Sequence, residues 1–274
     1  MVKTAEERQA VHRAFIKEHF SKQWNLTVAS IELDPRAQSN FVYHITLEHP
    51  VEHSGHLDAS HPGTSELPSG TTRLIFRVPS PDVPFNQSVR IQNAVAAADL
   101  MRQALTLDGL SPALVPSVYA WDTTGPDADG VGWIVEQHMQ GLGNQDFLFN
   151  GYPRDRQHAI LQEMAGILAA LQRFQLPESC KGYGSLAYNE TGEIVTVPIV
   201  VEPYSGPYDS FQAFYIGMLD EKLKEADRSP LAAGWREGGI RDRIEQFKAS
   251  KFQQILSEAK VDAERCLIHG DFSK

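Results

Sequence analysis

The chain has 274 residues, of which 42% are apolar and 22% charged, a balance typical of folded rather than disordered proteins. Its net charge of −10 at pH 7 would repel nucleic-acid phosphates and anionic membranes, and no apolar run is long enough for a signal peptide or a membrane span. The two distant cysteines, Cys180 and Cys266, argue against a disulfide framework and a zinc cluster. We therefore expect a cytoplasmic protein with neither nucleic acid nor membrane as a partner.

The first residues predict a helix followed by a strand-rich region. Thr4 and Glu7 form a capping box at the start of a segment with one apolar face. Residues 27–46 are rich in β-branched and aromatic side chains on both sides of a polar turn at residues 34–40, which indicates two strands. Further elements are expected as a strand at 72–78, a helix at 86–107, and strands at 117–121 and 131–136.

Residues 49–70 are rich in His, Ser, Pro and Gly and have no periodicity, so we expect a long exposed loop between two strands. The segment contains His49, His53, His56 and His61, which leaves a metal site as an alternative. No cysteine or closely spaced carboxylate accompanies these histidines, and a solvated loop is therefore the favoured interpretation.

The second half of the sequence changes class. Residues 155–174 carry large apolar side chains at spacings of three and four, which predicts a strongly amphipathic helix. A hairpin is expected across residues 188–201, with residues 189–192 as its turn. Two more helices are expected at 210–226 and 240–259. The expected fold class is α+β. An N-terminal lobe of residues 1–137 would hold a five-stranded antiparallel sheet, and a helical lobe would span residues 138–274.

The end of the chain has the pattern of a catalytic loop. An apolar lead-in, Leu267-Ile268, precedes His269-Gly270-Asp271. This segment resembles the catalytic loop of the aminoglycoside phosphotransferase and choline kinase-like family, which has a protein kinase-like fold. The resemblance implies ATP-dependent phosphoryl transfer to the hydroxyl of a small molecule, with Mg²⁺ as the metal. It makes Asp271 the acceptor of the hydroxyl proton and His269 a residue that fixes the loop by hydrogen bonding.

Other segments match the same family in chain order. They are Ser39-Asn40-Phe41-Val42-Tyr43 at the second strand, Leu74-Ile75-Phe76-Arg77 at the third, Gly132-Trp133-Ile134-Val135-Glu136 at the fifth, and Gly182-Tyr183-Gly184, which is common in fungal members. The resemblance implies that the nucleotide phosphates lie near Ser39, Asn40 and Arg77. It implies that adenine binds against a hinge formed by Glu136, Gln137 and His138. Each match also has a structural alternative: a hairpin turn, a strand-end cation or a plain glycine turn.

Two departures from the family pattern bear on activity. The helix glutamate that normally pairs with the basic residue of the third strand is replaced by Ala94, so we expect Arg77 to lack its usual partner. The magnesium-binding Asn and Asp that the family has after Asp271 are missing from this sequence, which ends at Lys274, so we expect a copy truncated in the catalytic loop. On this basis transfer by the chain as given is expected to be impaired, and enzyme activity stays an open question.

Two hypotheses follow. The chain is an ATP-dependent small-molecule phosphotransferase, or it is a non-catalytic kinase-fold module that binds a nucleotide or a partner. Ala94 favours the second hypothesis, and the ordered set of other matches favours the first. The identity of the acceptor cannot be read from these residues.

Overall fold

The computed structural model describes residues 4–59, 61–126, 131–141, 145–202, 204–258 and 265–268. His269 and Asp271 lie outside these residues. The chain divides into two compact units, which are described one at a time. The first unit comprises Met1–Val83, Ala94–Gln175 and Cys266–Lys274, and the second comprises Pro84–Asn93 and Leu176–Arg265. The sequence predicted a boundary between two lobes at residues 137 and 138. The two compact units are divided at other positions, and the lobe boundary stays a prediction.

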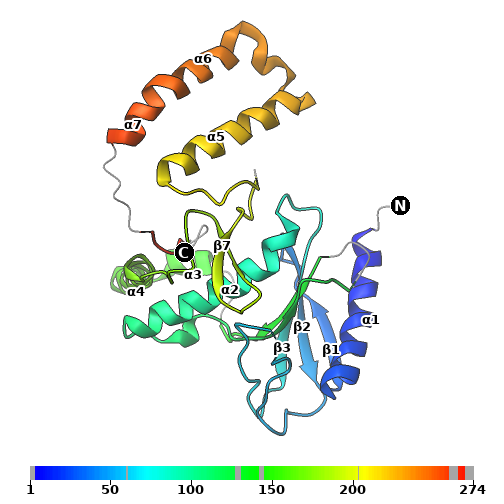
Figure 1. Ribbon diagram of the computed structural model, residues 1–274. Helices are drawn as coiled ribbons and strands as arrows, with labels where there is room; N and C mark the ends of the chain where they lie inside the picture. The colour runs from blue at the N-terminus through cyan, green and yellow to red at the C-terminus, as the bar shows by residue number, and fades with distance from the viewer. Residues whose placement is uncertain are drawn as a thin grey trace. The chain divides into compact units, whose positions relative to one another are not determined.

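A five-stranded antiparallel sheet forms the centre of the first unit (Figure 1). Its strands are β1 (Val28–Leu33), β2 (Asn40–Leu47), β3 (Arg73–Pro79), β4 (Val118–Asp122) and β5 (Trp133–Gln137), in the spatial order β1-β2-β3-β5-β4. The strands lie close to the predicted ranges because β-branched and aromatic residues favour strand conformation. The α+β class and the five-stranded antiparallel sheet predicted from the sequence are confirmed.

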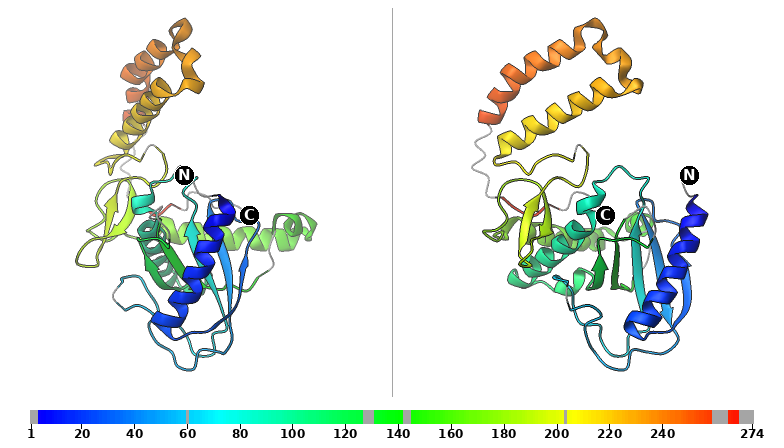
Figure 2. Two further views of the ribbon diagram at one scale, coloured as in Figure 1. Left: turned by 90° about the vertical axis from the view of Figure 1, so that its right-hand side faces the viewer. Right: turned by 45° about the vertical axis from the view of Figure 1, so that its right-hand side comes forward.

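Helix α1 (Ala5–Trp24) lies along one face of this sheet, as Figure 2 shows. The predicted capping box is present: Thr4 Oγ1 accepts from the Glu7 amide at 3.2 Å, and Glu7 Oε2 accepts from the Thr4 amide at 2.7 Å. The buried residues of the helix recur every four positions and form one stripe. They are Arg8, His12, Ile16 and Phe20.

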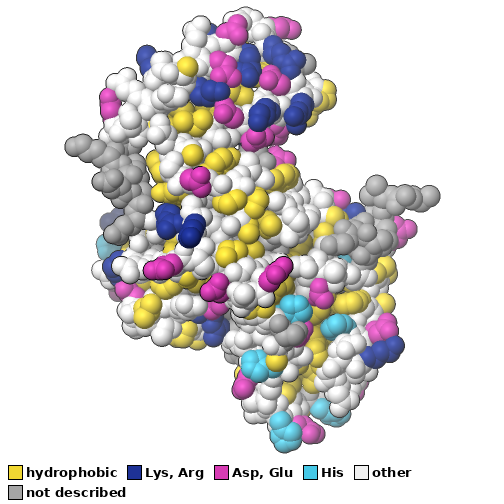
Figure 3. Space-filling view, in the orientation of Figure 1, with side chains coloured by type: hydrophobic (Ala, Val, Ile, Leu, Met, Phe, Trp, Pro, Cys, Tyr) yellow, Lys and Arg dark blue, Asp and Glu magenta, His cyan; other side chains and the backbone are white. Residues whose placement is uncertain are grey.

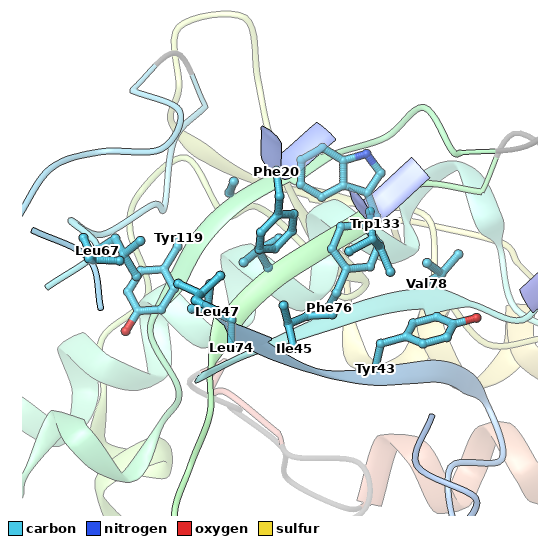
Figure 4. Packing of buried hydrophobic residues seen from close by; sticks show 14 of the residues in the cluster. Phe20, Tyr43, Ile45, Leu47, Leu67, Leu74, Phe76, Val78, Tyr119 and Trp133 are labelled. Atoms are coloured by element: carbon cyan, nitrogen blue, oxygen red, sulfur yellow. The ribbon is translucent and has the colours of Figure 1, made fainter. Parts of the chain in front are cut away.

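The stripe of α1 packs on the inward side chains of β2, β3 and β5 (Figure 4). Tyr43, Ile45 and Leu47 alternate along β2 and are buried, while the residues between them are only partly covered. Phe76 and Trp133 stack at 5.4 Å between ring centroids. Successive side chains of a strand point to opposite faces of the sheet. The residues that alternate with those of the aromatic core therefore point to the other face.

The segment between β2 and β3 is the long loop that the sequence predicts, but it is less exposed than expected because parts of it are packed and hydrogen-bonded. Val51 and Leu67 are buried in the core of the first unit. The Ser65 amide donates to the carbonyl oxygen of Val118 at 2.7 Å, and Trp121 Nε1 donates to that of Pro62 at 2.9 Å. These bonds hold the segment along the edge strand β4, which composition alone does not indicate.

Three helices belong wholly or partly to the first unit. They are α2 (Gln87–Leu107), which runs through both units, α3 (Gln145–Gly151) and α4 (Arg154–Arg173). Leu105 of α2, Val115 and Ala170 of α4 form a small apolar cluster. Arg173 holds both carboxylate oxygens of Asp108 at 2.7 to 3.1 Å and so ties the ends of the two helices together.

The second unit contains a hairpin of β6 (Ser185–Tyr188) and β7 (Ile194–Val197). Its turn lies where the sequence predicted it, with Asn189 Oδ1 accepting from the amides of Thr191 and Glu193. The strands lie earlier than expected. Side chains of α2 hold β6, because Asn93 Oδ1 accepts from the Leu186 amide at 2.8 Å and Gln92 Oε1 from the Tyr188 amide at 3.0 Å.

Helices α5 (Phe211–Arg228), α6 (Ile240–Phe247) and α7 (Gln253–Glu258) follow the hairpin, with a π-helical turn between the last two. The chain turns back after α5, so that α6 and α7 run beside it (Figure 1). Asp220 and Asp227 of α5 bind Lys248 at 2.6 Å and Arg236 at 3.1 Å. These ion pairs join α5 to the segments that lead into α6 and follow it. None of the helices in the described ranges has the length and apolarity needed to cross a membrane.

Candidate nucleotide-binding face

The strand register places several predicted site residues on one face of the sheet. Directly opposed residues of antiparallel strands point to the same side. Arg77 is opposite Val42, Asn40 is opposite Pro79, and Glu136 is opposite Ile75. Asn40, Arg77 and Glu136 therefore all lie on the face opposite to the aromatic core. We call these three residues, together with His44 and His138, the polar face.

Arg77 and Glu136 form an ion pair across β3 and β5. Arg77 Nη2 donates to Glu136 Oε2 at 3.1 Å, and the side chains are 29% and 15% exposed. Arg77 therefore has a carboxylate partner from the neighbouring strand, in place of the usual partner from the helix position of Ala94, which the sequence lacks. The side chain of Glu136 was missed as a partner because the two residues are 59 positions apart in the sequence. Only the strand register brings them together.

The polar turn before β2 is ordered by Asp34. Its carboxylate accepts from the Arg36 guanidinium at 2.8 and 3.0 Å and from the Arg36 amide at 3.0 Å. These hydrogen bonds hold the pKa of Asp34 well below its usual range. The turn leads into Asn40, the first residue of β2, and the carbonyl oxygen of Ser39 accepts from the Ser80 amide at 3.1 Å. Ser39 and Asn40, two of the three residues predicted to lie near the phosphates, thus lie where the start of β2 meets the end of β3.

The predicted hinge residues have different environments. Gln137 completes β5, and its side-chain oxygen accepts from the Ser117 amide at 3.2 Å, so this side chain holds the start of β4. His138 lies edge-on to His44 with 5.5 Å between the ring centroids. Burial lowers the pKa of His138, and the nearby charges of Arg73 and His44 lower it further. This imidazole is therefore neutral at pH 7.

The Gly182-Tyr183-Gly184 segment has a structural role in the second unit. Gly182 has a φ of +80°, and a Cβ atom there would clash with the carbonyl oxygen of Tyr208. Tyr183 and Tyr208 exchange backbone hydrogen bonds at 2.7 and 2.9 Å. The glycines allow this close approach, in agreement with the interpretation of the segment as a turn.

Histidine side chains are gathered near the strands and the loop of the first unit (Figure 3). His61 Nδ1 lies 2.7 Å from Asp58 Oδ2, and its ring lies 4.8 Å from that of Trp121. Within the described ranges no three His, Cys, Asp or Glu side chains are grouped so that they could hold a metal ion. His61 therefore contributes to the packing of the segment against β4.

Sequence comparisons return no match, either to a protein-family model or to a curated protein. Among solved structures, the chain is similar to aminoglycoside phosphotransferase APH(4)-Ia, with 13% identity over 94% of this chain and 62% of the other, at a TM-score of 0.43. A thermostable mutant of the same enzyme, in a ternary complex with ADP and hygromycin B, matches at 11% identity over 86% of this chain and 60% of the other, also at 0.43. The chain spans about three fifths of the length of these proteins. At this sequence identity and TM-score, the activity, ligands and residue roles of these proteins cannot be assigned to this chain.

Proposed function

We propose that the chain binds ATP on the polar face of its sheet and belongs to the ATP-dependent phosphotransferases that act on a hydroxyl group of a small molecule, in the cytoplasm. The observation that supports this most is the common placement of Asn40, Arg77 and Glu136 on one face, as the register requires. Arg77 is held by a carboxylate and is still partly exposed, as expected of a cation that contacts phosphate.

In the proposed complex the phosphates lie against Arg77 and the corner of Ser39 and Asn40, and adenine lies against the backbone of residues 136–138. The guanidinium has five N–H donors, of which the ion pair with Glu136 uses only some. A neutral His138 adds no charge near the base. The lobes of residues 1–137 and 138–274 would then carry the nucleotide and the acceptor, respectively.

The transfer step is assigned to Asp271. Its carboxylate accepts the proton of the acceptor hydroxyl while the hydroxyl oxygen forms a bond to the γ-phosphorus. The bond from that phosphorus to the β–γ bridging oxygen breaks, and ADP leaves with the electron pair. His269 would hold the loop that carries Asp271. Mg²⁺ neutralises phosphate charge in such reactions. In the part of the chain that the structure describes, no three His, Cys, Asp or Glu side chains are grouped so that they could hold it.

The binding site is tested by titrating the 274-residue chain with ATP. Arg77→Ala should weaken ATP binding about tenfold or more, since a charge-assisted hydrogen bond contributes on the order of 1.5 to 3 kcal/mol. Lys17→Ala removes a positive charge at an exposed position of α1, away from the polar face, and should change the affinity less than about twofold. Equal effects of the two variants would contradict the assignment of Arg77.

A non-catalytic nucleotide-binding module is the second candidate, supported by Ala94 at the helix position of α2 where the family has an acid. The two candidates differ in turnover. Phosphoryl transfer to a small alcohol or aminoglycoside that is lost in Asp271→Asn, with ATP affinity retained, supports the enzyme. ATP binding without any transfer supports the module.

A further inference from the structure

The carboxylate that orients Arg77 comes from the sheet. Glu136 lies opposite Ile75 on the adjacent strand, two positions from the residue opposite Arg77, and this diagonal arrangement allows two long side chains to meet. Their terminal atoms are 3.1 Å apart. Strands β3 and β5 are both hydrogen-bonded on two sides, so the backbone positions of the pair are fixed.

No carboxylate of helix α2 takes this role in the described part of the chain. Ala94 has no charged group, and Glu136 is the acid that pairs with Arg77 there. Asp99, also in α2, accepts instead from Gln103 Nε2 at 3.0 Å and lines a separate cavity of about 230 Å³ with Arg102. The ion pair at Arg77 is partly buried, with Glu136 only 15% exposed, so water screens it less than it would screen a surface pair.

We propose that Glu136 is the positioning residue of the nucleotide site: it holds Arg77 toward the phosphates and replaces the helix carboxylate absent at Ala94. This inference rests on the proposed binding of ATP to the polar face. An arginine stays protonated without a partner, so what the pair supplies is orientation. The carboxylate accepts from Nη2 of the guanidinium, which leaves other N–H groups of the fork for the phosphates.

The test is a double-mutant cycle read out by ATP titration of the full chain. Glu136→Gln keeps the shape and should weaken ATP binding about tenfold, whereas in the Arg77→Ala background the same change should have less than about a twofold effect. Glu136→Asp keeps the charge and should retain more affinity than Glu136→Gln. Glu163→Gln, at an exposed position of α4, is the matched charge control. Thermal unfolding of each variant reports whether it is folded.

Adenosine, which has no phosphate, separates positioning from a general effect on the sheet. Its affinity should be unchanged by Glu136→Gln, because the hinge backbone remains. The proposal is overturned if Glu136→Gln leaves ATP affinity unchanged, if it has the same effect in the Arg77→Ala background, or if adenosine binding falls in parallel. ATP binding that is insensitive to Arg77→Ala, or no ATP binding by the unmodified chain, would instead overturn the proposed nucleotide site and the positioning role with it.

Discussion

Gly182 has a φ of +80°, where a side chain is strained, and a Cβ atom there would clash with the backbone of Tyr208. Gly182→Ala should therefore lower the free energy of unfolding by roughly 1 to 3 kcal/mol. Gly166→Ala is the matched control, since Gly166 lies within α4 and no atom stands within 4 Å of a Cβ there. It should raise the free energy of unfolding by about 0.5 to 1 kcal/mol. Denaturant unfolding measures both, and a loss of equal size at Gly166 would contradict the clash.

His138 makes stability depend on pH. Its pKa is lowered in the folded chain, mainly by burial, so the unfolded chain takes up the proton first as the pH falls through about 6.5. The unfolded state then binds more protons than the folded one, and the free energy of unfolding decreases as the pH decreases. His138→Gln should reduce this loss between pH 7 and pH 5 in denaturant titrations. An unchanged slope would mean that His138 is not the group responsible.

Several site residues could be predicted from the sequence, but their contacts could not. Asn40, Arg77 and Glu136 belong to recognisable strand segments. Alternation separates core from non-core positions along β2 but not along β3, where three consecutive residues are buried. The ion pair depends on which strands are neighbours and on their register. In this sheet β3 pairs with β5 and not with β4, the next strand along the chain, and that order is a tertiary property.

At the scale of the elements, strong periodicity predicted helices well. The loop at residues 49–70 is less exposed than predicted. Its few apolar residues, such as Leu67, are far apart in the sequence, and its hydrogen bonds to β4 leave no local pattern. The start of β6 was also misplaced. Amide groups there bond to Asn93 and Gln92 of α2, and no local pattern reveals partners more than ninety positions away.

Helix α4 gives a matched pair of leucines for testing the amphipathic interpretation. Leu171 is 2% exposed, whereas Leu161 on the same helix is 46% exposed. Leu171→Ala should cost about 2 to 5 kcal/mol through lost burial and the cavity that remains. Leu161→Ala should cost less than about 1 kcal/mol. Thermal or denaturant unfolding checks the difference, and similar losses at both positions would mean that the helix packs through another face.

At the scale of the whole molecule, burial is distributed unevenly between the two compact units. The first unit holds the aromatic core around Phe76 and Trp133. In the second unit, Leu223 is the one buried residue of α5, and the described parts of α6 and α7 contain none. The side chains of the ion pairs that hold these helices are 21% to 54% exposed, and ion pairs near the surface each contribute little.

This contrast predicts two levels of protection in native-state hydrogen exchange. Amides of β2, β3 and β5 should exchange only when the first unit unfolds, because their hydrogen bonds lie beside the buried core. Amides of α6 and α7 should exchange much earlier, through local opening that exposes little apolar surface and therefore responds weakly to denaturant. Mass spectrometry of exchange at increasing low denaturant concentrations distinguishes the two classes. Lys248→Gln removes the bond to Asp220 and should increase exchange in α6 while leaving β3 unchanged. Equal protection of the sheet and of these helices, lost in a single cooperative step, would show that buried side chains do not set the stability of this segment.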